Sequence, residues 1–181
     1  MNIETLDYFA SIWKYWMIAS FLLGILGFIF AKNYRVANGH YKQKFLVLGI
    51  ILIIQAPVTF FIGTNSVENI QNNARIELLK NINNNCVIRI NGKELNNEQS
   101  QLIINEITKI KKPDPHHSNS TKFMKISVVC GNEIYDLTFE QDSQYENEFW
   151  IFLDKYNFTR SNEIGRINSE LIKTLANTVY N

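Results

Sequence analysis

The sequence predicts an α+β protein, with an N-terminal two-helix transmembrane hairpin followed by a small soluble domain. Two apolar stretches without a charged residue, 15–31 and 45–63, indicate the hairpin. As a helix rising about 1.5 Å per residue, the second stretch is long enough to cross a hydrocarbon core of roughly 30 Å. Residues 64–181 are more polar and rich in asparagine, and they are numerous enough for one domain with its own core.

The first apolar stretch indicates a retained helix rather than a cleaved signal peptide. Signal peptides have a basic start and a small-residue cleavage site. Here the start contains Glu4 and Asp7, and no such site follows the apolar run. We therefore assign 1–63 to a hairpin that remains in the lipid bilayer.

The charge of the connector between the two helices predicts their orientation. Residues 32–44 contain four basic residues and no acidic one. Short basic loops stay on the cytoplasmic side of a membrane. We expect a multi-pass protein of the bacterial inner (plasma) membrane, with a cytoplasmic connector. The N-terminus and the C-terminal domain would be periplasmic.

Four residues within the hairpin are candidates for membrane contacts. Gly24 and Gly27 are small enough for close helix approach. Gln55 is polar, and Pro57 removes a backbone donor two residues later. Two interpretations stay open: a kinked, hydrogen-bonding contact with the first helix or a membrane partner, or a proline kink in an ordinary hairpin.

The pattern of residues 64–181 predicts helices on one face of a mainly antiparallel sheet of about four strands. Alternating apolar residues or short apolar runs indicate strands, and helical spacing together with Ser66 and Asn97 as caps indicates two or three helices. Residues 157–165 show neither pattern. The expected strands are 86–90, 124–130, 135–139 and 149–153, and the expected helices begin at 66, 97 and 168.

Both cysteines lie in the soluble domain, Cys86 at the start of the first strand and Cys130 at the end of the second. In an oxidising compartment they could form a disulfide if their strands are neighbours. The alternative is two small, buried thiols. The two cysteines do not form a CxxC motif, the spacing that would indicate a metal site.

The loop 114–120 holds the histidines of the soluble domain, and it could supply His116, His117 and Asp114 as metal ligands. A metal site needs three or four positioned ligands, so we favour a solvated loop without metal. Ser118 belongs to the same loop.

A second candidate segment, 142–150, mixes carboxylates with aromatic residues. In one interpretation its side chains line a binding cleft together with Arg166 and His117. In the other, it is an acidic loop followed by a core strand. The candidate binding residues of this segment are Asp142, Ser143, Glu148 and Trp150.

Several function classes find no support in the sequence. It has no P-loop or dinucleotide fingerprint, and no cofactor is expected. A net charge of +1 and the lack of a basic patch with interleaved aromatics exclude a nucleic-acid partner. Neither Ser118 nor Ser143 has the glycines of a nucleophile elbow, although a triad with His117 and Asp142 can be written.

Three segments resemble a group of small bacterial membrane proteins with a two-helix anchor. The segments are His116-His117-Ser118, Asp142-Ser143 with Glu148-Phe149-Trp150, and Ile164-Gly165-Arg166-Ile167. The resemblance spans roughly residues 87–172 and brings no activity with it. It implies that the three segments converge in space. Residues 166–170 depart from the group, where a more basic, threonine-bearing turn is expected.

We expect a membrane-anchored, extracytoplasmic binding or interaction protein, such as an immunity or accessory factor, rather than an enzyme. Its partners would be the lipid bilayer and another protein at the membrane, and its oligomeric state stays open. One alternative is a membrane-tethered hydrolase, metal-dependent or Ser/His-based, using His116, His117 and Asp142. Another is an assembly subunit of a membrane complex.

Overall fold

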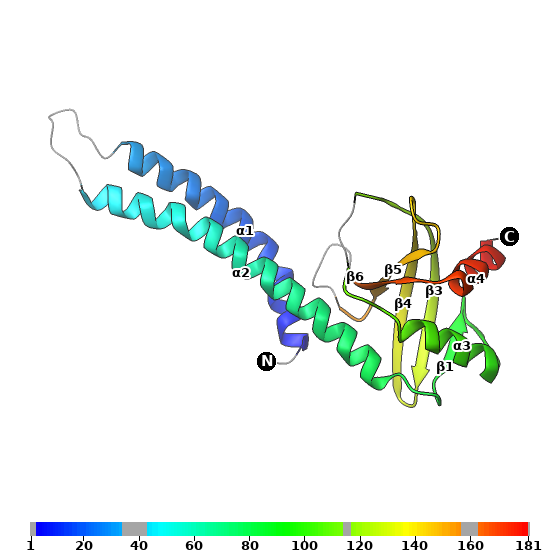
Figure 1. The fold of residues 1–181 in the computed structure, drawn as a ribbon. Coiled ribbons are helices and arrows are strands. Elements are labelled where there is room, and N and C mark those ends of the chain that lie inside the picture. The colour runs from blue at the N-terminus through cyan, green and yellow to red at the C-terminus, as the bar shows by residue number, and fades with distance from the viewer. Residues whose placement is uncertain (1–2, 34–42, 114–116, 157–162, 181) are drawn as a thin grey trace. The chain divides into compact units, whose positions relative to one another are not determined.

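The computed structural model describes residues 3–33, 43–113, 117–156 and 163–180. It confirms the α+β class and the two long, apolar N-terminal helices (Figure 1). The chain forms two compact units, Met1–Glu68 and Asn69–Asn181.

The first unit contains helix α1 (Ile3–Lys32) and most of helix α2 (Gln43–Asn81), and each is long and apolar enough to cross a membrane. Small residues let the two helices approach closely. A Cβ atom built on Gly27 would lie 2.6 Å from Leu52 Cβ and 2.7 Å from the Gly49 carbonyl oxygen. Gly24 has more room, since its Cβ would lie 3.2 Å from Ala56 Cβ. A larger side chain at Gly27 would force the helices apart.

Gln55 joins the two helices through hydrogen bonds. Ser20 Oγ donates to Gln55 Oε1 at 2.7 Å, and Gln55 Nε2 donates to the Ser20 carbonyl oxygen at 2.7 Å. Pro57 lies inside α2, which continues through it. The polar side chain of the second helix therefore bonds the first helix, which satisfies both groups away from water.

The expected helix cap at Ser66 is wrong. Helix α2 runs without interruption to Asn81, and Ser66 Oγ donates to the Ile62 carbonyl oxygen at 2.8 Å. A serine inside a helix commonly satisfies its hydroxyl in this way. Ile70, Ala74 and Leu78, four residues apart, are fully buried along the last turns of α2.

The second unit contains a six-stranded antiparallel sheet in the order β2-β1-β3-β4-β5-β6. The prediction of about four strands is therefore wrong. Strand β2 has two residues, too few to show an alternating pattern. Strand β6 includes Gly165 and pairs through a register shift, and the sequence before it has no strand signal. The strands are β1 (Val87–Ile90), β2 (Lys93–Glu94), β3 (Ser120–Cys130), β4 (Glu133–Asp142), β5 (Glu148–Leu153) and β6 (Glu163–Asn168).

Helix α3 (Asn97–Ile107) contacts β1 and helix α4 (Glu170–Tyr180) contacts β3 on one face of this sheet, and Asn81 at the end of α2 donates a hydrogen bond to the Tyr135 hydroxyl. Figure 1 shows α3 and α4 beside the strands. The cap of α3 is Asn96 rather than Asn97, because the Asn96 side chain accepts from the Gln99 amide. Helix α4 begins two residues later than expected, since β6 extends to Asn168.

Side chains alternate along the strands between the helix-covered face and a second face. Ile126, Leu137 and Ile151 point to the covered face, and each is at most 1% exposed. Phe123 and Ile134 lie on the second face, where they are 61% and 54% exposed. The candidate site belongs to this second face.

A disulfide joins Cys86 and Cys130, with their Cα atoms 4.4 Å apart. Val87 pairs with Val129, so Cys86, directly before β1, stands opposite Cys130 at the end of β3. The strands β1 and β3 are neighbours in the sheet, although β2 and α3 separate them in sequence. The bond closes a loop across 44 positions. Such a link stabilises the fold chiefly by restricting the unfolded chain.

Replacing both cysteines, as Cys86→Ala/Cys130→Ala, is expected to lower the free energy of unfolding by about 2–4 kcal/mol. The measurement is thermal unfolding of the full chain in detergent, with and without a reducing agent. The reductant should lower the midpoint of the native chain and leave that of the variant unchanged. Equal midpoints for the native chain and the variant under oxidising conditions would contradict the expectation.

Candidate functional site

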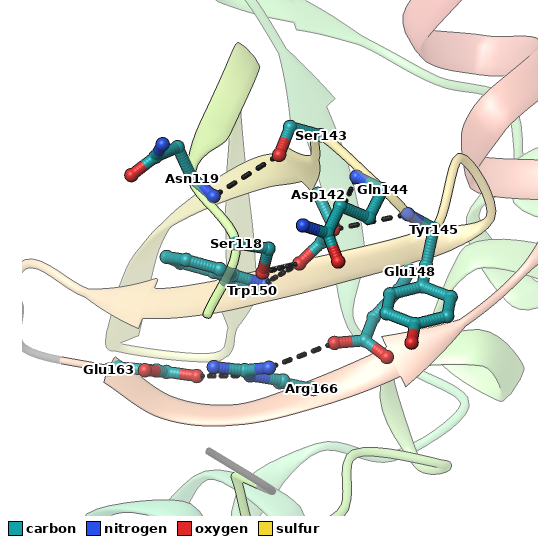
Figure 2. A network of polar contacts seen from close by, with 10 residues as sticks. All are labelled: Ser118, Asn119, Asp142, Ser143, Gln144, Tyr145, Glu148, Trp150, Glu163 and Arg166. Carbon is teal, nitrogen blue, oxygen red and sulfur yellow. Dashed lines mark hydrogen bonds and ion pairs between the residues drawn. The ribbon is translucent and has the colours of Figure 1, made fainter. Parts of the chain in front are cut away.

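The candidate site lies where β4 ends and β5 begins, with β6 beside them (Figure 2). Trp150 on β5 pairs with Arg166 on β6, so their side chains are cross-strand neighbours on the second face. Asp142, the last residue of β4, lies on the same face near Trp150. Antiparallel pairing thus brings together residues that are 24 positions apart in sequence.

The carboxylate of Asp142 is the centre of the site. This residue is only 2% exposed. Its Oδ2 accepts hydrogen bonds from Ser118 Oγ and, at 2.9 Å, from Trp150 Nε1. Its Oδ1 accepts from the backbone amides of Gln144 at 2.8 Å and Tyr145 at 3.1 Å. Two donors on each oxygen compensate the carboxylate for its removal from water.

Hydrogen bonds join residues 117–119 to the loop that follows Asp142. The Ser143 amide donates to the Asn119 carbonyl oxygen at 2.8 Å, and the Asn119 amide donates to Ser143 Oγ at 3.2 Å. Gln144 Nε2 donates to the His117 carbonyl oxygen at 3.2 Å. These contacts unite residues 117–119 and 142–148 in one surface, which we name the loop cluster.

Arg166 connects the loop cluster to the edge of the sheet. Its guanidinium lies over the Trp150 ring, 4.5 Å from the centroid, and forms ion pairs with Glu148 at 3.0 Å and Glu163 at 2.8 Å. The side chain is 11% exposed. Burial lowers the pKa of Arg166, but hydrogen bonds and charge from Glu163 and Glu148 outweigh it and raise the pKa overall. The guanidinium is therefore a fixed cation.

The structure places most of the candidate binding residues in this one network. All three segments of the resemblance contribute to it. His117 contributes its backbone carbonyl, while its side chain is exposed. His116 lies outside the described residues. The network contains Ser118, Asp142, Ser143, Glu148, Trp150 and Arg166.

The hydroxyls of the site are engaged in structural bonds. Ser118 donates to Asp142 rather than to an imidazole, and Ser143 accepts from a backbone amide. Among the described residues, no group of three or more His, Cys, Asp or Glu side chains is arranged to hold a metal ion. The bonds of this site therefore hold the exposed side chains of the loops in fixed positions.

Sequence reasoning missed four members of the site. Asn119, Gln144 and Tyr145 act largely through the backbone, which leaves no sequence signal. Glu163 falls in the stretch 157–165, for which we predicted no strand. An acidic residue three positions before Arg166 was the available signal, and it required knowing that β6 is a strand.

Asp142→Asn is expected to destabilise the domain by about 1–3 kcal/mol, because an amide offers one acceptor atom where the carboxylate offers two. Two of the four donors then lose their acceptor. Faster amide hydrogen exchange at Gln144 and Tyr145 would report this change locally.

Asp136→Asn is the matched control, because Asp136 is exposed and its side chain accepts from Ser127 Oγ at 2.6 Å. It should alter stability by no more than about 0.5 kcal/mol. Unchanged exchange at Gln144 and Tyr145 in Asp142→Asn would show that the carboxylate does not hold the loop.

No protein-family model, no curated protein and no solved structure matches this chain.

Proposed function

We propose that this chain is a binding protein anchored in the bacterial inner membrane by a helical hairpin. Its C-terminal domain lies outside the cytoplasm and recognises another protein through the loop cluster. The observation that carries this proposal is the buried Asp142 carboxylate, whose bonds to Ser118, Trp150 and two backbone amides hold the loop cluster in one conformation.

The surface of the first unit supports the membrane anchor. Its outward side chains are apolar, and Phe21, Phe28 and Phe61 are each 65–66% exposed. Such a surface is unfavourable in water and favourable in lipid. The polar residues Ser20 and Gln55 instead bond each other between the helices, as expected when lipid surrounds the hairpin.

Two independent features support the extracytoplasmic location of the domain. The basic connector favours the cytoplasmic side, which leaves both ends of the hairpin on the opposite side. The Cys86–Cys130 disulfide is of the kind that persists in oxidising compartments.

The form of the loop cluster supports recognition of a protein. Loops held in one conformation bind with a small entropy cost. Tyr145 is 53% exposed on this surface, and tyrosine is enriched at protein interfaces. His117, Asn119 and Gln144 add exposed hydrogen-bonding groups around it.

A photo-reactive p-benzoylphenylalanine at Tyr145 of the full chain is expected to cross-link one discrete protein in intact cells. The same probe at Ile134, which is 54% exposed on the β3–β4 hairpin, is the matched control and should yield no such product. Adding Asp142→Asn to the Tyr145 probe should reduce the product, because the loop loses its fixed form. No product at Tyr145, or the same products at both positions, would refute recognition by the loop cluster.

The orientation is tested with fusions. Alkaline phosphatase fused after Asn181 should be active, and a fluorescent protein that matures only in the cytosol should be dark at the same position. Fusions within the connector at 38–39 should show the reverse pattern. A bright cytosolic reporter after Asn181 would place the domain in the cytoplasm and overturn this part of the proposal.

A further inference from the structure

A cavity of about 430 Å³ lies along the β6 edge of the sheet, beside the loop cluster. Its walls come from the segment after α3, from β5 and from β6. The lining residues are Lys109, Lys111, Lys112, Glu148, Arg166, Ile167 and Asn168. The disulfide does not line this cavity, and the bonds between the loops of the loop cluster do not fill it.

The lysine segment is fixed to the sheet by its backbone. The Lys111 amide donates to the Arg166 carbonyl oxygen at 2.9 Å, and the Arg166 amide donates to the Lys111 carbonyl oxygen at 3.0 Å. A Cβ atom at Gly165 would lie 2.4 Å from Ile110 Cγ2 and closer still to the Lys111 carbonyl oxygen, so only glycine permits this approach. Backbone pairing therefore holds Lys111, and the neighbouring Lys112, at the cavity.

The lining contains four basic residues and one carboxylate. Glu148 and Glu163 both form ion pairs with Arg166, and Glu106 forms one with Lys109, so these three carboxylates offset part of the positive charge. Lys111 and Lys112 are exposed. The four basic groups outnumber these three carboxylates by one, so an anion entering the cavity meets a small net positive charge.

We propose that this cavity binds the phosphate group of a small phosphorylated molecule or of a lipid headgroup. Lysine ammonium groups bind phosphate as point charges. The volume lies within the range of about 300–1,000 Å³ typical of small-ligand pockets. The ligand site goes beyond the proposed function and does not require a protein partner, so either proposal can fail alone.

The test uses the full chain in nanodiscs of zwitterionic phosphatidylcholine, titrated calorimetrically with pyrophosphate. Lys111→Gln/Lys112→Gln should weaken binding at least about tenfold, the effect of losing charge-assisted hydrogen bonds. The matched control is Lys93→Gln/Lys125→Gln, which removes the same charge from exposed positions on β2 and β3. It should weaken binding less than about twofold, because exposed charges at a distance are screened.

A second titration, with glycerophosphoglycerol, distinguishes the two sources of phosphate. This probe is the deacylated headgroup of phosphatidylglycerol. Tighter, lysine-dependent binding of pyrophosphate would indicate a soluble phosphorylated ligand, and tighter binding of the headgroup would indicate a lipid. Binding of neither probe, or equal weakening by the two double variants, would overturn the proposal. If the cavity variant unfolds, Lys111→Gln alone carries the same comparison.

Discussion

The carboxylate of Asp142 is buried at the end of β4, and a charge in such a place is tolerated only where neighbours donate hydrogen bonds to it. Here this requirement organises the surroundings. The Trp150 indole must present its N–H to the carboxylate, which leaves the ring face available for the Arg166 guanidinium. Arg166 in turn is matched by Glu148 and Glu163. Hydrogen bonds, a cation–π contact and ion pairs thus form a continuous network from the loop cluster to the edge of the sheet.

The hairpin unit satisfies a comparable requirement with different residues. Its outward surface is apolar, so polar atoms must find partners between the helices. Ser20 and Gln55 do so by bonding each other. Gly27 and Gly49 lie on the same helix–helix interface, where they let the two backbones approach closely. Loss of close packing would therefore also separate these two polar groups.

Local patterns predicted the elements whose signals lie within a few consecutive residues. The alternation along β3 and β4 and the glycine in the turn between them are visible directly in the sequence, and in the structure Gly131 adopts a φ of 61°. Contacts between distant segments were not visible. The disulfide stayed open because β1 and β3 become neighbours across an intervening strand and helix. Strand β6 was missed because glycine is not a strand-forming residue. Gly165 is needed there to let the Lys111 backbone approach β6 closely.

The candidate site shows the same division. One interpretation of segment 142–150 placed Asp142, Glu148 and Trp150 in a cleft with Arg166, and only the resemblance implied that these segments converge. Neither indicated that Asp142 is buried and bound by donors, because two of those donors are backbone amides. A sequence pattern specifies side chains, whereas the conformation of the loop determines which amides converge on one oxygen.

The pairing of Lys111 with Arg166 also bears on how the domain behaves at high concentration. An outer strand with unpaired backbone groups invites strands from other molecules and leads to aggregation. On β6, part of this backbone is already engaged by Lys111, and Arg75 Nη1 donates to the Ile164 carbonyl oxygen at 3.2 Å. The segment that carries the lysines therefore also shields the β6 edge of the sheet from pairing with strands of other molecules.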